Sequence, residues 1–164
     1  MADVRVLSDD DWKLWRELRL TALAEAPYAF GSTLAGWQDA SEERWRDRLR
    51  IPGGRDLVAY LDDDPVGMAS GVPAGADTIE IISVWVSPAG RGHGVGDALI
   101  DAIADWAAVS GATTLRLSVR PTNTAAIRLY ERAGFGHLGP NSEDPDEILM
   151  ERSLPSSRRD ESAA

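Results

Sequence analysis

The chain of 164 residues predicts an α+β fold, in which helices flank a central mixed sheet. Short apolar strand patterns in the first half return through a turn, which is typical of antiparallel hairpins. Strand and helix patterns alternate in the second half, which is typical of a parallel crossover. A glycine-dense turn separates the longest strand pattern from a helix pattern. We therefore expect one domain over residues 1–154, with a sheet that is antiparallel at its start and parallel at its centre.

The first half reads as a strand, two helices and a hairpin. Ser8 or Asp9 caps a helix that continues to Glu25, because both side chains can accept hydrogen bonds from the free N–H groups at a helix start. Ala26-Pro27 ends this helix. The other expected elements are a strand at residues 4–7, a loop at 27–37, a helix at 41–49, and strands at 57–61 and 66–72 joined by a turn at 62–65.

The second half starts with the longest strand pattern, at residues 78–86. The helix expected at residues 95–110 has Leu99, Ile103 and Trp106 on one face and Gly111 at its end. We further expect a strand at 114–119, a helix at 123–132, and short strands at 135–138 and 147–152. The polar segment 155–164 is expected to be a flexible tail.

Composition and charge argue against several functions. The net charge is −10, from 17 basic and 27 acidic residues, so a nucleic acid would be repelled. The sequence contains no cysteine, which excludes disulfides, cysteine-based zinc sites and a cysteine nucleophile. No apolar run reaches the length of a signal peptide or a membrane span. These features predict a cytoplasmic protein without a membrane partner.

The most informative segment is Arg91-Gly92-His93-Gly94-Val95-Gly96, which follows a strand pattern and begins a helix pattern. N–H groups at a helix start lack partners, the helix dipole favours an anion there, and glycine lets the backbone approach a ligand. The segment therefore predicts a phosphate site. A dinucleotide-binding fold does not fit, because the next strand ends in Arg120 rather than an acidic residue and hairpins come first. A P-loop does not fit either, because no Gly-Lys-Ser/Thr follows.

This segment, preceded by Val86-Ser87-Pro88, resembles the Arg/Gln-x-x-Gly-x-Gly/Ala signature of the GNAT superfamily of acetyl-CoA-dependent N-acetyltransferases. A second family signature is a helix that begins at Asn, contains Tyr and is followed by Gly-Phe. It resembles the residues Asn123, Ala126, Tyr130, Gly134 and Phe135. The resemblance extends over residues 4–154. It implies the GNAT acyl-CoA N-acyltransferase fold and acetyl-CoA as co-substrate, without a metal.

The resemblance also implies which residues bind acetyl-CoA. The loop amides hold the pyrophosphate, and the backbone of the central strand bonds the pantetheine arm. In this family that strand usually contains a bulge, which leaves backbone groups unpaired. The implied cofactor-binding residues are Val84, Trp85, Val86, Arg91, Gly92, His93, Gly94, Val95, Gly96, Asp97, Asn123, Ala126 and Tyr130.

Tyr130 and Glu80 are the expected catalytic residues. Asn123, Ala126 and Tyr130 share one helical face, and the Tyr130 hydroxyl is expected to protonate the departing CoA thiolate. The alternative is an ordinary half-buried tyrosine. Glu80 lies within an apolar strand and is expected to accept the proton of the attacking amine, directly or through water; a solvent-facing Glu80 is the alternative. Without a bulge, Trp85 would lie on the opposite face of the strand from Glu80.

The acceptor site in this family lies between the loop that joins the first two helices and the turn before the last strand. Those segments correspond to residues 27–37 and 139–147. Phe30 and Trp37 either wall this site or belong to the core. Acidic residues of the second segment either attract an amine or remain solvated: Glu143, Asp144, Asp146 and Glu147.

The predicted function is transfer of an acetyl group from acetyl-CoA to a primary amine, by direct attack in a ternary complex. The alternatives are a non-catalytic acyl-CoA sensor and an N-acyltransferase that uses another acyl-CoA. The sequence does not identify the acceptor, which is a small molecule, a peptide or a protein. Dimers are common in the family, so the resemblance leaves a homodimer open.

Overall fold

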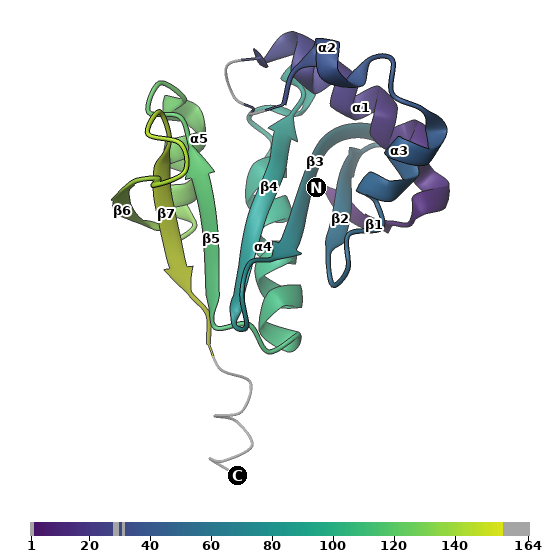
Figure 1. Cartoon of the computed structure of the whole chain (residues 1–164). Coiled ribbons are helices and arrows are strands. Elements are labelled where there is room, and N and C mark those ends of the chain that lie inside the picture. Colours follow the sequence, from purple (N-terminus) through teal and green to yellow (C-terminus); the bar gives the residue numbers. More distant parts are fainter. Residues whose placement is uncertain (1, 28–29, 31, 156–164) are drawn as a thin grey trace.

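The computed structural model describes residues 2–27, 30 and 32–155. Its strands are β1 (Asp3–Leu7), β2 (Arg55–Leu61), β3 (Asp64–Pro73), β4 (Thr78–Val86), β5 (Thr114–Val119), β6 (Gly136–Pro140) and β7 (Ile148–Ser153). They form a seven-stranded sheet in the order β1-β2-β3-β4-β5-β7-β6 (Figure 1). Neighbouring strands are antiparallel except β4 and β5, which are parallel. The predicted mixed sheet with a parallel centre is confirmed.

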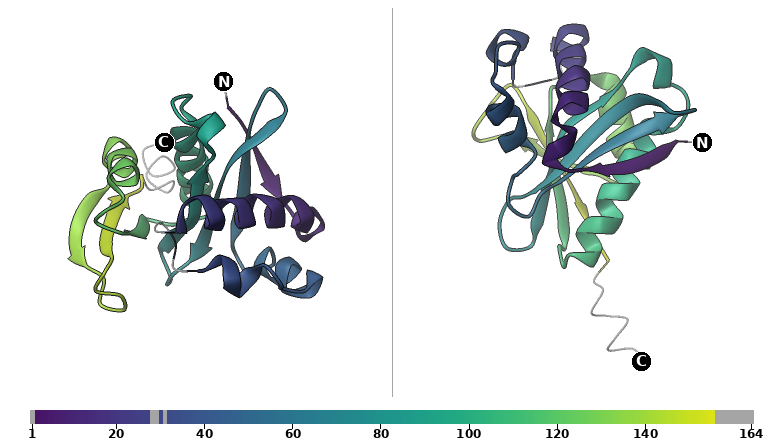
Figure 2. Two further views of the ribbon diagram at one scale, coloured as in Figure 1. Left: turned by 90° about the horizontal axis from the view of Figure 1, so that it is seen from above. Right: turned by 90° about the vertical axis from the view of Figure 1, so that its right-hand side faces the viewer.

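Helices cover both faces of this sheet (Figure 2). α1, α2 and α3 share one face with a core around Trp15 and Trp45, whereas α4 and α5 contribute to a core around Leu99 and Ile103 on the other face. No helix within the described ranges is both long enough and apolar enough to cross a bilayer. The helices are α1 (Trp12–Glu25), α2 (Leu34–Trp37), α3 (Glu42–Arg48), α4 (Val95–Val109) and α5 (Thr124–Arg132), and 3-10 turns at Asp9–Asp11 and Pro88–Gly90 precede α1 and α4.

The segment expected as a loop at residues 27–37 contains the short helix α2. Thr33 caps this helix, since its hydroxyl accepts a hydrogen bond from the Gly36 N–H at 3.1 Å. A single helical turn is too short to leave a periodic apolar pattern in the sequence. Residues 28, 29 and 31 of this segment, and residues 156–164 of the expected tail, lie outside the described residues.

The β2–β3 hairpin is tighter than expected. Asp62 and Asp63 alone form the turn, with φ angles of 48° and 69°. Asp tolerates this left-handed conformation better than most residues with a side chain. Pro65 consequently lies inside β3, opposite Tyr60, at a position where the register shifts. A proline is accommodated there because a bulge removes the need for a ladder hydrogen bond.

A second irregularity is a bulge in β4. The register between β3 and β4 shifts by one residue between Met68 and Ser70, so β4 carries an extra residue there. Ser83 lies at this point and has a φ of 57°, which is uncommon for a residue with a side chain. The bulge changes the alternation of side chains. Trp85 packs in the α1–α3 core, on the same face on which Glu80 lines a cavity, whereas a regular strand would separate them.

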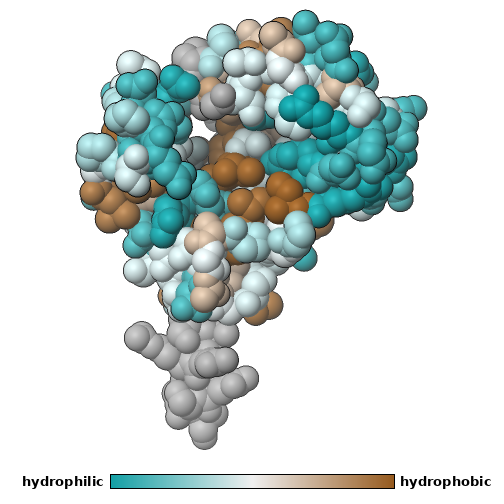
Figure 3. Space-filling view, in the orientation of Figure 1, coloured by the Kyte–Doolittle hydropathy of each residue, from teal (hydrophilic) through white to brown (hydrophobic). Residues whose placement is uncertain are grey.

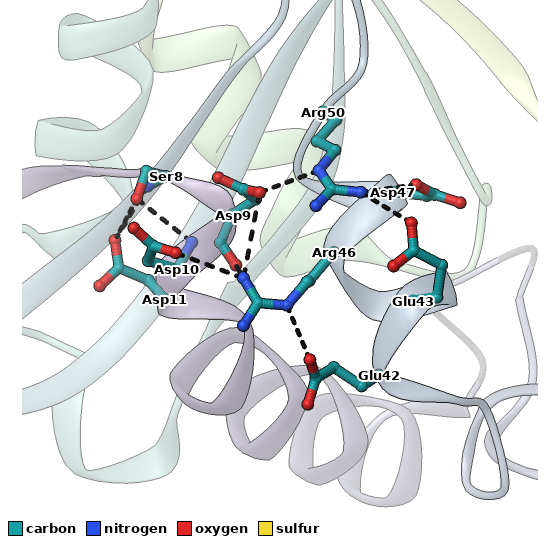
Figure 4. Close-up of polar contacts among 9 residues, drawn as sticks. All are labelled: Ser8, Asp9, Asp10, Asp11, Glu42, Glu43, Arg46, Asp47 and Arg50. Atoms are coloured by element: carbon teal, nitrogen blue, oxygen red, sulfur yellow. Dashed lines mark hydrogen bonds and ion pairs between the residues drawn. The ribbon is translucent and has the colours of Figure 1, made fainter.

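An ion-pair network attaches α3 to the chain before α1 (Figure 4). Arg50 Nε lies 2.9 Å from Asp9 Oδ2, and Arg46 Nη1 lies 3.3 Å from Asp10 Oδ1. The hydrogen bond from Arg50 lowers the pKa of Asp9 below its ordinary value. The network fixes the helical layer that forms one wall of the cavity described below. Three acidic side chains of α3 also accept hydrogen bonds from these guanidinium groups, Glu42 from Arg46 and both Glu43 and Asp47 from Arg50.

Candidate functional site

The sheet separates between β4 and β5. These strands pair only at Thr78, Ile79 and Glu80 of β4. From residue 81 to 86, the edge of β4 toward β5 has no strand partner among the described residues, although β5 continues beside β7 to Val119. Figure 1 shows the two strands diverging, and Figure 3 shows the surface hollowed in the same view. An unpaired strand edge inside a sheet can bond an extended ligand through its backbone.

The glycine-rich segment connects β4 to α4. No N–H group of residues 92–97 donates a backbone hydrogen bond to any residue that the structure describes. Gly94 is the N-cap of α4 in the left-handed conformation, with a φ of 73°, and a Cβ added there would meet no atom within 4 Å. Because α4 has 15 residues, its dipole adds positive potential at this end. The row of N–H donors at residues 92–97 is therefore suited to bind a pyrophosphate.

Arg91 is engaged with the protein itself. Its N–H donates to the Pro88 carbonyl at 3.4 Å, its Nε to the Val86 carbonyl at 3.2 Å, and its Nη2 to Glu25 at 2.7 Å. Glu25 also accepts a hydrogen bond from Trp85 Nε1 at 2.9 Å. The bonds from Trp85 and Arg91 lower the pKa of Glu25. These contacts join α1, β4 and the glycine-rich segment, and CoA binding by Arg91 stays a prediction.

Helix α5 lies against the start of α4. A Cβ added at Gly96 would come within 2.9 Å of Leu129 Cδ2, so glycine permits the close approach of the two helices. Asn123 caps α5, since its side-chain oxygen accepts a hydrogen bond from the Ala126 N–H at 3.3 Å. The helix that carries the second signature therefore borders the first turn of the helix that carries the glycine-rich one.

Tyr130 is buried in the core between α4 and the sheet and is 6% exposed. Its ring packs edge-on against Phe135, with 5.9 Å between the ring centroids. Burial raises the pKa of the Tyr130 hydroxyl, which keeps the phenol protonated at neutral pH. Glu80 lines the large cavity and Tyr130 does not, so the structure does not bring the two predicted catalytic residues into one cavity wall.

The cavity measures about 720 Å³ and lies between the α1–α3 layer, β4 and the segment before β7. Both segments expected to form the acceptor site contribute to its wall, through Phe30 and Trp37 on one side and Asn141 and Glu147 on the other. Arg120, just after β5, donates a hydrogen bond to the Phe30 carbonyl at 3.4 Å and so connects the two sides. The structure therefore brings together the two segments that the sequence resemblance named.

Carboxyl groups gather in the wall formed by β4 and the segment before β7. They belong to Glu80, Glu143, Asp144 and Glu147. Burial raises the pKa of Glu147, its hydrogen bond with Asp144 and the charges of Asp144 and Glu80 raise it further, and the charge of Arg120 opposes them. A carboxyl group with a raised pKa suits proton transfer near neutral pH. Glu147, expected from the sequence only to attract an amine, is thus a second candidate base.

The helical layer contributes two arginines to the cavity wall. Arg48 is paired, with Nη1 3.0 Å from Asp56 and Nη2 donating to the hydroxyls of Ser70 and Ser83 at 3.0 and 3.1 Å. Arg19 is 8% exposed, and its Nη1 is buried without an acceptor among the described residues. Burial, and in second place the charge of Arg48, lowers the pKa of Arg19 to about 10.

The aromatic residues predicted to wall the acceptor site contact the protein's own arginines. Arg19 Cζ lies 4.4 Å from the centre of the Phe30 ring, and Arg44 Cζ lies 4.0 Å from that of Trp37. Trp37 also packs against Trp45 at 4.8 Å between centroids. Phe30 and Trp37 line the cavity and also pack with the α1–α3 core. Their contact with a substrate stays a prediction.

The sequence analysis does not single out Arg19, although the sequence holds a signal for it. Arg19 lies within the buried stripe of α1, between Leu18 and Ala22, where an arginine is unusual. Trp15 and Trp45 also line the cavity, but their sequence pattern is that of ordinary core residues. Only the packing of α1 against α3 shows that these side chains share one wall.

A sheet opened at its parallel centre, followed by a glycine-rich turn with free N–H groups, defines the class of proteins with the GNAT fold. The model of the acetyltransferase (GNAT) family matches residues 13–135 and so covers both signatures. The chain belongs to this family. The resemblance and the fold class derived from the sequence are confirmed.

Known relatives agree with this assignment. Mycothiol acetyltransferase of Renibacterium salmoninarum is 32% identical over 133 residues, which cover 77% of this chain and 38% of that protein. L-2,4-diaminobutyric acid acetyltransferase of Nocardia farcinica is 34% identical over 121 residues, which cover 67% of this chain and 62% of that protein. The chain thus spans less than two thirds of the length of these two relatives.

Solved structures show the same fold. PaiA N-acetyltransferase from Thermoplasma acidophilum, in complex with coenzyme A, superposes with a TM-score of 0.76 over 94% of this chain and 99% of that one. The sequence identity is 17%, so this similarity concerns the fold alone.

Proposed function

We propose that this chain transfers an acetyl group from acetyl-CoA to the nitrogen of an amine. One observation carries the proposal, namely the succession of three features along β4. The middle of the strand lines an acidic cavity, its edge at residues 81–86 lacks a strand partner, and the N–H row at residues 92–97 follows directly. An acceptor amine, the pantetheine arm and the pyrophosphate of CoA each match one of these features.

The residues present fit acetyl-CoA, which supplies an activated thioester when bound. The N–H row offers donors for the pyrophosphate, and the space beside Gly92 and Gly94 is open to a ligand. The unpaired edge of β4, with Val84 and Trp85, offers backbone groups to the amides of the pantetheine arm. Asn123 stands at the start of α5, which borders the same turn.

Carboxyl groups of the cavity are the proposed proton acceptors. Glu80 and Glu147 line the same cavity, and the charge of Glu80 adds to the burial and the Asp144 contact that raise the pKa of Glu147. One carboxylate takes the proton from the amine. The amine nitrogen can then form a bond to the thioester carbonyl carbon, whose oxygen is polarised by a backbone N–H near Val86.

Tyr130 is the proposed proton donor. As the C–N bond forms and the C–S bond breaks, the Tyr130 hydroxyl gives its proton to the departing sulfur. The second proton that the nitrogen loses on becoming an amide returns to the Tyr130 oxygen. A tyrosine hydroxyl is ordinarily protonated at neutral pH, and burial raises the pKa of Tyr130 further. Tyr130 follows Asn123 by two helical turns on α5, and Ala126 and Ile127 lie between them on the same face.

The names of the relatives point to different acceptors. One relative is named for mycothiol and another for L-2,4-diaminobutyric acid. L-2,4-Diaminobutyric acid carries two amino groups, which supports an amine acceptor for this chain.

A thiol-release assay tests the proposed function. Acetyl-CoA is offered with a panel of amines, amino acids and peptides. The variant Tyr130→Phe is compared with Tyr60→Phe, because Tyr60 lies on β2, where its ring packs under Arg5. We expect Tyr130→Phe to lower kcat at least ~100-fold because it removes a general acid. Tyr60→Phe should leave kcat unchanged.

Three outcomes would contradict parts of the proposal. Unchanged turnover in Tyr130→Phe would remove Tyr130 from the acid role. Binding of acetyl-CoA without thiol release with any amine would favour the sensor. Release only with malonyl-CoA or succinyl-CoA would favour transfer of another acyl group.

A further inference from the structure

Three residues in the wall of the large cavity each carry a buried N–H donor that has no acceptor among the described residues. These donors are Nη1 of Arg19 and Nε1 of Trp15 and Trp45. Among the described residues, no other buried side-chain nitrogen or oxygen lacks a partner. Nearly all buried polar groups in folded proteins are hydrogen-bonded, so three exceptions on residues of one cavity wall are unusual. All three groups are donors, and the matching ligand group is therefore an acceptor.

Arg19 gives this group its charge. Its guanidinium stacks on Phe30 and has no carboxylate partner among the described residues. The neighbouring Arg48 shows the contrast, since it is paired with Asp56. A buried guanidinium without a counter-ion destabilises a fold, and its planar donors match a carboxylate better than any other common group.

The cavity has opposite charges on its two sides. The helical layer contributes Arg19, whereas β4 and the segment before β7 contribute Glu80, Asp144 and Glu147. An ammonium group is attracted to the acidic side, and a carboxylate to Arg19. A small molecule with both groups complements the whole cavity.

We propose that the acceptor is an amino acid or a similar small molecule whose free carboxylate pairs with Arg19, while its amino group lies toward Glu80 and Glu147. This inference rests on the proposed function and names the substrate class of the same site. Arg19 determines specificity through binding and takes no part in proton transfer. Simple polyamines lack the carboxylate and are poor acceptors by this account.

Thermal unfolding without ligand tests whether Arg19 is retained for binding. Arg19→Met is expected to raise the melting temperature, because an apolar chain of similar length replaces a buried charge that has no carboxylate partner among the described residues. Arg48→Met is the matched control and should lower the melting temperature, since it leaves Asp56 buried without its partner. If Arg19→Met lowers the melting temperature as Arg48→Met does, Arg19 is structural and the proposal fails.

Matched acceptors test the carboxylate directly. Lysine, lysinamide and cadaverine share one amine-bearing chain and differ at the carboxyl group, and alanine and alaninamide form a shorter pair. In whichever acid–amide pair is turned over faster, we expect the wild type to have a kcat/KM for the free acid ~10- to 100-fold above that for the amide. This ratio corresponds to the loss of a charge-assisted hydrogen bond. Arg19→Met should abolish this preference by raising KM for the acid alone. Equal losses for acid and amide, or no preference in the wild type, would overturn the proposal.

Two further measurements distinguish the acceptor from the acyl donor, and binding from turnover. Arg19→Met is assayed in two reactions, namely succinyl-CoA with an amine that lacks a carboxyl group, and acetyl-CoA with an amino acid. If the variant slows only the first reaction, Arg19 binds the carboxylate of the acyl donor, and the assignment to the acceptor is wrong. If no amine releases thiol, the proposed function fails, and binding still tests the inference. Lysine, but not lysinamide, should then stabilise the wild type against heat, and neither should stabilise Arg19→Met. Equal stabilisation by both compounds would overturn it.

Discussion

Single residues in this protein are tuned by their neighbours, and Glu147 is the clearest case. Burial and the carboxylates of Asp144 and Glu80 raise its pKa above the ordinary value. Because a base is inactive while protonated, we expect activity to rise with pH through this raised pKa if Glu147 is the proposed base. The folded state also holds the proton more tightly than the unfolded state. The stability that Glu147 contributes is therefore present at low pH and is lost as the pH rises through the folded pKa.

The pH dependence of kcat/KM measures this coupling. Glu80→Gln removes one neighbouring charge, so the pKa of Glu147 falls toward its ordinary value. The part of the pH profile in which kcat/KM rises with pH, its rising limb, should therefore move to lower pH. In Glu147→Gln, that limb should disappear. Glu151→Gln on β7 is a suitable control, because this carboxylate faces Arg116 rather than the cavity. A limb that survives unchanged in Glu147→Gln would exclude Glu147 as the base.

Among the secondary-structure elements, the turn between β4 and α4 is the one whose conformation and function can be separated by substitution. Gly94 has a positive φ and open space where a side chain would project. Alanine at this position is destabilising only because of the left-handed backbone conformation, whereas asparagine adopts that conformation at a lower cost. Either side chain would project into the space proposed for the pyrophosphate.

We expect Gly94→Ala to lower the free energy of unfolding by ~1–2 kcal/mol, the cost of the left-handed conformation for a residue with a Cβ. Gly94→Asn should stay closer to the wild type in urea unfolding. Both variants should raise KM for acetyl-CoA, because both fill the same space. Unchanged KM values in both would show that the pyrophosphate does not bind at this turn.

Much of the element pattern was predictable from the sequence, because it rests on local physics. The 3.6-residue period of α4 and the capping side chain of Asn123 act within a few residues. The bulge at Ser83 was not predictable from its residue type, because it arises where β4 must pair with β3 and separate from β5. The face of Trp85 depends on that bulge and could not be derived without it.

The site was predictable to the same extent. The glycine-rich turn and the helix from Asn123 are local motifs, and the structure brings them together at Gly96 and Leu129. The lack of an acceptor for Arg19 among the described residues is a tertiary property, because it depends on what α3 and Phe30 place around the guanidinium. The raised pKa of Glu147 is tertiary as well. Local periodicity carries no information on either.

The whole molecule is held open along the unpaired edge of β4, so a ligand that bonds there should stabilise the entire fold. At a coenzyme A concentration of 100 times Kd, mass action adds ~2.7 kcal/mol of stability. For a chain of this size that corresponds to a rise in melting temperature of ~5–10 °C. Thermal unfolding with coenzyme A measures it, and NAD is the control. An equal shift with NAD would indicate a site for pyrophosphates in general.

The short pairing between β4 and β5 also has a mechanical consequence. Three residue pairs at Thr78–Glu80 join the two strands, so they act as a fulcrum for β5 and the strands beyond it. From there to the far end of β4 the lever arm is roughly 20 Å at the usual rise per residue. A rotation of about 5° at the fulcrum therefore widens the far end by roughly 2 Å over that same arm. The contact from Arg120 to the Phe30 carbonyl joins the two sides of the opening, so it opposes such a rotation.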